Sequence, residues 1–170
     1  MFTTARASFA HLSLDSEPGD YIGQGNRFDI TYNTSHGDII CANIFSRLSD
    51  GSPAQLHWIL YGSSILENKY ASVSFGTDAL GIPIMNRVYP EARRPAFATS
   101  GFAGLEVSFQ DRGSNQVFGS FTIREVTFTE PDPLQNLIPL KILNFDAEFL
   151  QRSESPNAPA LRGEFQYKLL

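Results

Sequence analysis

The chain has 170 residues, of which 42% are apolar, including fourteen Phe, six Tyr and one Trp. This length predicts one domain spanning residues 1–170, and the aromatic content predicts a large core, which excludes a disordered chain. The net charge of −5 argues against nucleic-acid binding, and no apolar segment of the sequence is long enough to span a membrane.

Alternation of apolar and polar residues recurs along the chain and is typical of half-buried β-strands. We predict strands at 8–14, 27–32, 39–45, 55–61, 70–75, 105–109, 117–128, 143–149 and 161–169. Turns rich in Gly, Pro, Asn and Asp separate them. About nine or ten strands predict an all-β fold, a two-sheet antiparallel β-sandwich of the jelly-roll kind; a closed β-barrel is the alternative.

Three of these strands carry more specific expectations. Residues 39–45 are apolar on both faces, which predicts a central strand that is covered on each side. The last two strands are joined by the loop 153–159, which predicts a hairpin. We expect their aromatic residues to face the interior; these are Phe145, Phe149, Phe165 and Tyr167.

Cys41, within the apolar run, is the only cysteine, so no internal disulfide can form. We expect it to be a buried thiol that behaves as a small apolar side chain. The first seven residues lack the apolar region of a secretory signal. These observations predict a cytoplasmic protein, with a secreted chain that has lost its signal as the alternative.

Two stretches interrupt the alternation, a long connection at 76–104 and a proline-rich segment at 130–139. The first contains the predicted ligand-binding residues, which are Arg87, Tyr89, Arg93, Arg94 and Phe97. Guanidinium groups bind anions through paired hydrogen bonds, and aromatic rings stack on sugars. The alternative interpretation is a solvated loop in which Tyr89 and Phe97 cover the edge of the core.

Other polar groups give weaker indications of chemistry. Asp146, Glu148 and Glu164 occupy polar positions of neighbouring strands, and paired carboxylates are what glycoside hydrolysis requires. Cross-strand pairing with arginine on a solvent-facing surface explains them more simply. The three histidines are scattered without metal-ligand spacing. We therefore predict no catalytic residues, no metal site and no cofactor.

Several short motifs follow one another in order, namely GDYIGQG at 19–25, GLEVS at 104–108, DRGSN at 111–115, GSFT at 119–122, NFDAEF at 144–149 and APALRG at 158–163. Together they resemble an uncharacterised β-rich domain of large secreted bacterial multidomain proteins, over about residues 15–168. The family has no assigned activity. Secreted members often have cysteine where this chain has Ser114 and Ser153, and the resemblance implies that such a pair forms a disulfide. Two serines fit a reducing compartment.

Three hypotheses for function follow. The first is a non-catalytic binding module for a carbohydrate or a small anion, or for a protein partner. The second is a structural or assembly subunit, for which an oligomer is expected. The third is a small β-barrel enzyme, such as a cyclase or isomerase, which requires a cavity above about 300 Å³.

Overall fold

The computed structural model describes residues 6–64, 69–97, 99–130 and 140–170. These residues form ten strands and three short 3₁₀ helices. The strands are β1 (Ser8–Ser16), β2 (Arg27–Asn33), β3 (Ile39–Arg47), β4 (Pro53–Tyr61), β5 (Ala71–Gly76), β6 (Val88–Arg93), β7 (Ala103–Phe109), β8 (Val117–Phe128), β9 (Ile142–Ser153) and β10 (Ala160–Leu169). The 3₁₀ helices are η1 (Thr34–His36), η3 (Asp78–Leu80) and η4 (Pro95–Phe97). Within the described ranges, no helix has the length and apolar character that crossing a bilayer requires.

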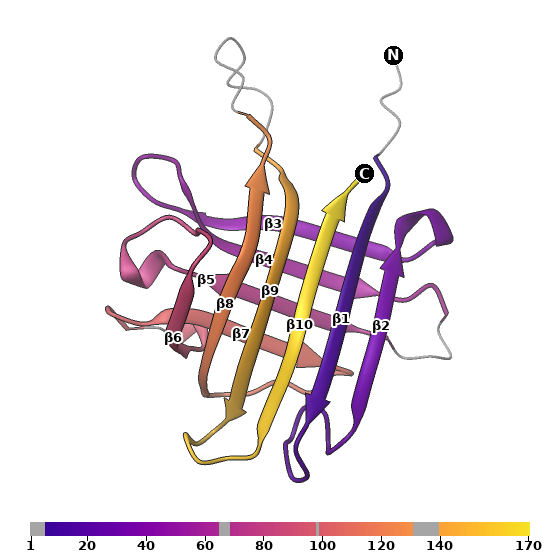
Figure 1. Ribbon diagram of the computed structural model, residues 1–170, viewed down its shortest axis with the longest axis vertical. Helices are drawn as coiled ribbons and strands as arrows, with labels where there is room; N and C mark the ends of the chain where they lie inside the picture. The colour runs from indigo at the N-terminus through magenta and orange to yellow at the C-terminus, as the bar shows by residue number, and fades with distance from the viewer. Residues whose placement is uncertain (1–5, 65–68, 98, 131–139) are drawn as a thin grey trace.

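All ten strands belong to one sheet, in the order β2-β1-β10-β9-β8-β6-β7-β5-β4-β3. Figure 1 shows this sheet folded into two layers, with β8, β9, β10, β1 and β2 in front. Strands β3, β4, β5 and β7 cross behind them at a steep angle (Figure 1). The predicted all-β fold is therefore confirmed, and the sheet is nearly closed, as in the barrel alternative. The jelly-roll likeness stays a prediction.

The core lies between the two layers and is built from the alternate residues that each strand turns inward. Trp58 is completely buried at its centre, with its ring centroid 4.7 Å from that of Phe145 and 4.9 Å from that of Phe165. Phe149 and Tyr167 are also buried, so all four aromatic residues predicted to face inward do so. The hairpin of β9 and β10 is confirmed by their antiparallel pairing.

The prediction of a central strand at 39–45 is wrong, because β3 is one of the two edges of the sheet. Its residues alternate between exposed and half-buried, and Cys41 falls on the exposed side. The expectation of a buried thiol is therefore also wrong. The cause is the position of β3, since only its inner face meets the other layer and its outer face has no covering element among the described residues.

The connection 76–104 is more regular than expected, because it contains η3, β6 and η4. Strand β6 joins the two layers, pairing antiparallel with β8 and parallel with β7. Its pairing with β8 shifts register between Tyr89 and Ala92, around Pro90. A proline within a stretch of apolar and polar residues argues against a strand when only the sequence is known. Pro90 therefore left the residues of β6 without a clear strand pattern.

The motif at 19–25 forms a turn that is held together by the side chains of Asp20 and of Ser16, the last residue of β1. Asp20 is only 3% exposed, and its Oδ2 accepts hydrogen bonds from the Gly23 amide at 2.7 Å and the Ser16 hydroxyl at 2.8 Å. The Ser16 Oγ in turn accepts one from the Gly25 amide at 2.9 Å. These contacts give the motif a structural role.

Ser114 and Ser153 lie against each other, although 38 residues separate them in the chain. Both are buried, and their Oγ atoms are 2.6 Å apart. Two positions that are distant in the sequence are thus neighbours in this fold.

Candidate functional site

Three of the five predicted ligand-binding residues line one cleft. Arg93, Arg94 and Phe97 lie along it with residues that precede or begin β8. The cleft has a volume of about 570 Å³, and we call it the Arg93 groove. Its lining is Arg93, Arg94, Phe97, Asn115, Gln116, Val117 and Phe118.

The other two predicted residues, Arg87 and Tyr89, are not part of this lining. Tyr89 is 2% exposed, and its ring stacks on Phe121 with a centroid distance of 4.6 Å. Its hydroxyl donates to the Met85 carbonyl at 3.1 Å, and burial raises the pKa of this phenol. The Arg87 guanidinium lies 5.5 Å from the Tyr89 ring centroid, before the start of β6. Tyr89 therefore covers the core edge, whereas Phe97, to which the alternative interpretation gave the same role, is exposed.

Arg93 is held by two aromatic rings. Its guanidinium carbon lies 4.4 Å from the ring centroid of Phe102 and 4.8 Å from that of Phe118. One terminal nitrogen donates to the Ala92 carbonyl at 2.9 Å. Within the described part of the chain, no carboxylate forms an ion pair with Arg93. The groove thus contains an oriented positive charge with N–H donors left for a ligand.

Arg94 differs from Arg93 because its charge is already balanced. Its Nε lies 2.8 Å from the Glu106 Oε1, and both side chains are largely shielded from solvent. The Arg94 guanidinium also lies 5.3 Å from the ring centroid of Phe97. Phe97 itself is 66% exposed, so one large aromatic surface of the groove is open to a ligand.

Two amide side chains complete the groove. Asn115 and Gln116 are both exposed, and their backbone amides donate to the Glu154 Oε1, at 2.6 and 3.4 Å. Their side-chain amides make no hydrogen bond to another described residue. Sequence reasoning missed these residues and Phe118, because they reach the groove only through the pairing of β6 with β8.

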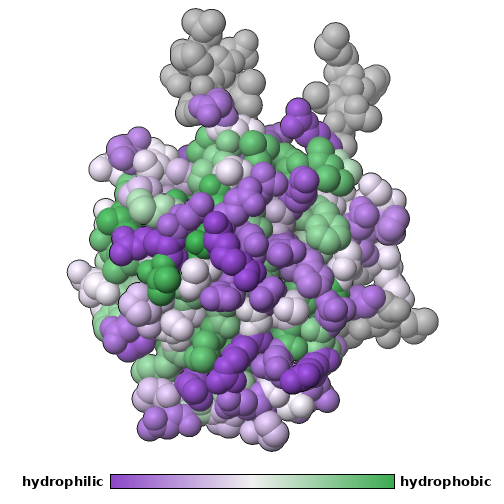
Figure 2. Space-filling view, viewed as in Figure 1, coloured by the Kyte–Doolittle hydropathy of each residue, from purple (hydrophilic) through white to green (hydrophobic). Residues whose placement is uncertain are grey.

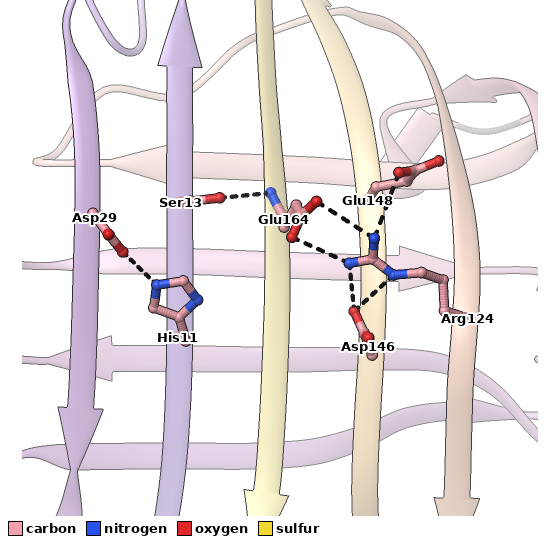
Figure 3. Close-up of polar contacts among 7 residues, drawn as sticks. All are labelled: His11, Ser13, Asp29, Arg124, Asp146, Glu148 and Glu164. Carbon is pink, nitrogen blue, oxygen red and sulfur yellow. Dashed lines mark hydrogen bonds and ion pairs between the residues drawn. The ribbon is translucent and has the colours of Figure 1, made fainter.

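A second cleft, of about 680 Å³, lies on the outer face of the front layer. Hydrophilic residues gather across this face in Figure 2. Figure 3 shows Arg124 of β8 surrounded by three carboxylates from β9 and β10. Its NH2 lies 2.7 Å from Asp146 and 3.3 Å from Glu164, and its NH1 lies 3.6 Å from Glu148.

Three further ion pairs lie on or beside this face. Figure 3 shows the His11 ring in contact with the Asp29 carboxylate. The Arg27 Nε lies 3.1 Å from Asp15, and the Arg162 NH1 lies 2.6 Å from Glu17. The carboxylates are thus bound in cross-strand ion pairs, as the simpler interpretation predicted.

The geometry does not place Glu148 and Glu164 as a catalytic pair. Glycoside hydrolysis needs one carboxyl group that is free to protonate the scissile bond, whereas both of these carboxylates form an ion pair with the same guanidinium. The sequence did not single out Arg124, because a bulge between Ile123 and Glu125 sets its register against β9.

Among the residues with described positions, no three His, Cys, Asp or Glu side chains are grouped closely enough to hold a metal ion. Both clefts exceed 300 Å³, so cavity size alone does not separate the binding hypothesis from the enzyme hypothesis. Comparison of the chain with protein-family models, curated proteins and solved structures found no match.

Proposed function

We propose that this chain is a non-catalytic binding module whose Arg93 groove holds an acidic saccharide. The observation that carries the proposal is the Arg93 guanidinium, which is fixed between Phe102 and Phe118 without a carboxylate partner among the described residues. Such a group binds a carboxylate with paired, charge-assisted hydrogen bonds. Its rings also limit its motion before the ligand arrives, which lowers the entropy that binding costs.

The other lining residues suit a sugar ring. The exposed face of Phe97 offers the apolar surface on which a pyranose can stack. The side-chain amides of Asn115 and Gln116 offer both donors and acceptors for hydroxyl groups. A small inorganic anion would use only Arg93, whereas an acidic saccharide uses all four groups.

The front-layer cleft is larger but supports this function less well. The two arginines of its lining, Arg27 and Arg162, each already contact a carboxylate, so a ligand would have to break an existing ion pair. The resemblance to domains of large secreted bacterial proteins also favours binding over catalysis, since those domains often stand beside Ig-like repeats or sorting tails.

Isothermal titration of the full chain with glucuronate and with glucose tests the proposal. We expect glucuronate to bind at least about tenfold more tightly, because only the acid engages Arg93. Arg93→Gln should remove this preference. Arg27→Gln is the matched control, because Arg27 is an exposed arginine outside the groove, and it should leave the preference unchanged. Equal affinities for the two sugars, or no binding of either at millimolar concentration, would overturn the proposal.

A second candidate function is assembly through the outer face of β3. Phe45 is 70% exposed and Ile39 is 55% exposed on this edge strand, and neither has a covering element among the described residues. Sedimentation velocity should then show a dimer that Phe45→Glu dissociates. A monomer at high concentration would exclude self-assembly.

A further inference from the structure

A third cleft opens between the two layers, where β3 of the back layer faces the beginning of β9 and the end of β10. It has a volume of about 400 Å³, and we call it the upper crevice. In Figure 2, hydrophobic residues gather toward this upper end of the front layer, which Figure 1 locates at the end of β10. The crevice shares no residue with the Arg93 groove.

The walls of the upper crevice are mixed, with apolar side chains beside polar ones. Ile44 of β3, Ile142 of β9 and Leu169 of β10 line it from three sides. All three belong to the hydrophobic core or pack against it, so the crevice is an opening into the interior between the layers. An apolar chain that entered it would be removed from water by these side chains.

One polar group of the crevice makes no hydrogen bond within the described residues. Tyr167 lines the crevice and is only 6% exposed, yet its hydroxyl makes no hydrogen bond to another described residue. Burial raises the pKa of this phenol, so it is a neutral hydroxyl that can donate. This hydroxyl is not one of the fully buried atoms without a partner, so it reaches solvent at the crevice, where a ligand oxygen can accept its hydrogen bond.

The crevice also carries positive charge. Arg47 and Lys141 both line it and both are exposed, and no acidic residue belongs to the lining. Arg47 donates to the Gly51 carbonyl at 3.1 Å, and neither cation forms an ion pair with another described residue. Both positive charges are therefore left for an anionic group of a ligand.

We propose that the upper crevice binds a free amphiphile with a single apolar tail and an anionic head, of the class of medium-chain carboxylates. The tail lies against Ile44, Ile142 and Leu169, and the carboxylate lies at the mouth near Arg47 and Lys141. Tyr167 donates its hydroxyl hydrogen to the same ligand. The volume is at the low end of the range for small-molecule sites, which suits one short tail and excludes a two-tailed lipid.

Calorimetric titration of the full chain with decanoate, decanol and acetate tests this proposal. Decanoate should bind saturably below its micelle concentration, about tenfold more tightly than decanol, because decanol lacks the charge. Acetate lacks the tail and should show no measurable binding. Vesicles of anionic phospholipid form a further arm, and we expect them not to bind. Equal binding of decanoate and decanol, or binding to the vesicles alone, would overturn the proposal.

Variants then locate the site. Arg47→Gln combined with Lys141→Gln should weaken decanoate binding about tenfold, whereas Lys168→Gln, an exposed lysine outside the lining, should not change it. Ile44→Trp should fill the crevice and abolish binding. Tyr167→Phe keeps the ring and should weaken binding a few-fold in a folded protein, which circular dichroism checks for each variant. Unchanged affinity in both the double variant and Ile44→Trp would refute the site.

Discussion

The Arg93 groove and the outer face of the front layer both contain arginines on strands, but they differ in what surrounds each charge. Arg124 touches three carboxylates, whereas Arg93 touches two aromatic rings and no carboxylate among the described residues. The first arrangement is satisfied within the chain, and the second leaves donors for another molecule. The comparison teaches that the number of existing partners, rather than the density of charge, distinguishes a structural surface from a ligand site.

The two regions should therefore respond differently to substitution. A change in the front layer removes contacts within the chain and should lower the free energy of unfolding without affecting binding in the groove. A substitution that only restrains the backbone around the Arg93 groove should leave the affinity for glucuronate unchanged. The predictions below test this difference, beginning with the largest expected effect.

Replacing both Ser114 and Ser153 by cysteine would restrain the loop that carries Asn115 and Gln116. Their Oγ atoms are 2.6 Å apart, so a disulfide can form across a loop of about 40 residues and should raise the free energy of unfolding by about 4 kcal/mol. Urea unfolding with and without reductant measures the effect. A Cys41→Ser background prevents mispairing with the exposed native thiol. Lost affinity for glucuronate would show that the groove must move to bind.

Gly163→Ala should disrupt the front layer, because the pairing of β10 with β1 leaves no room for a side chain there. A Cβ at this position would lie 2.3 Å from the Ser13 carbonyl oxygen and 2.6 Å from the Phe149 Cζ. We expect the free energy of unfolding to fall by about 2–3 kcal/mol in urea titrations. Gly113→Ala is the control, because its Cβ would make an ordinary 3.7 Å contact with Ser108. Equal effects of the two substitutions would contradict this explanation.

Arg124→Gln should lower the free energy of unfolding by about 1 kcal/mol, since three carboxylates would then face one another without a cation. High salt screens this repulsion, so the loss should be smaller in high salt than in low salt. Chemical unfolding at two salt concentrations measures both values. Affinity for glucuronate should match that of the unsubstituted chain, and a weaker affinity would mean that the two regions are coupled.

The smallest expected effect is the contribution of Glu17 to the pH dependence of stability. A hydrogen bond from the Ala160 amide, followed by one from Arg162, lowers the pKa of this carboxyl below its ordinary value of 4.5. The ionised form is thus favoured in the folded state, and its stabilisation is present above pH 4.5 and lost as pH falls through the folded pKa. Glu17→Gln should flatten the acid side of the melting-temperature profile. A profile that keeps its full slope would assign the acid sensitivity to other groups.

The sequence by itself determined the all-β class and most of the core. Side chains of a strand point to alternate faces, so the positions of Phe145, Phe149, Phe165 and Tyr167 predict burial without knowledge of the neighbouring strands. The same regularity predicted nine of the ten strands, and the turns between them, from local signals alone.

Only the tertiary structure decided which strands are neighbours, because strand order depends on contacts between residues that are distant in the chain. It placed β3 at an edge and so exposed Cys41, which its apolar neighbours had indicated to be buried. It also brought Asn115, Gln116 and Phe118 beside Arg93, and it turned Tyr89 into the core. Alternation assigns a residue to a face of a strand, whereas a binding site depends on which faces meet, and that is a property of the folded chain.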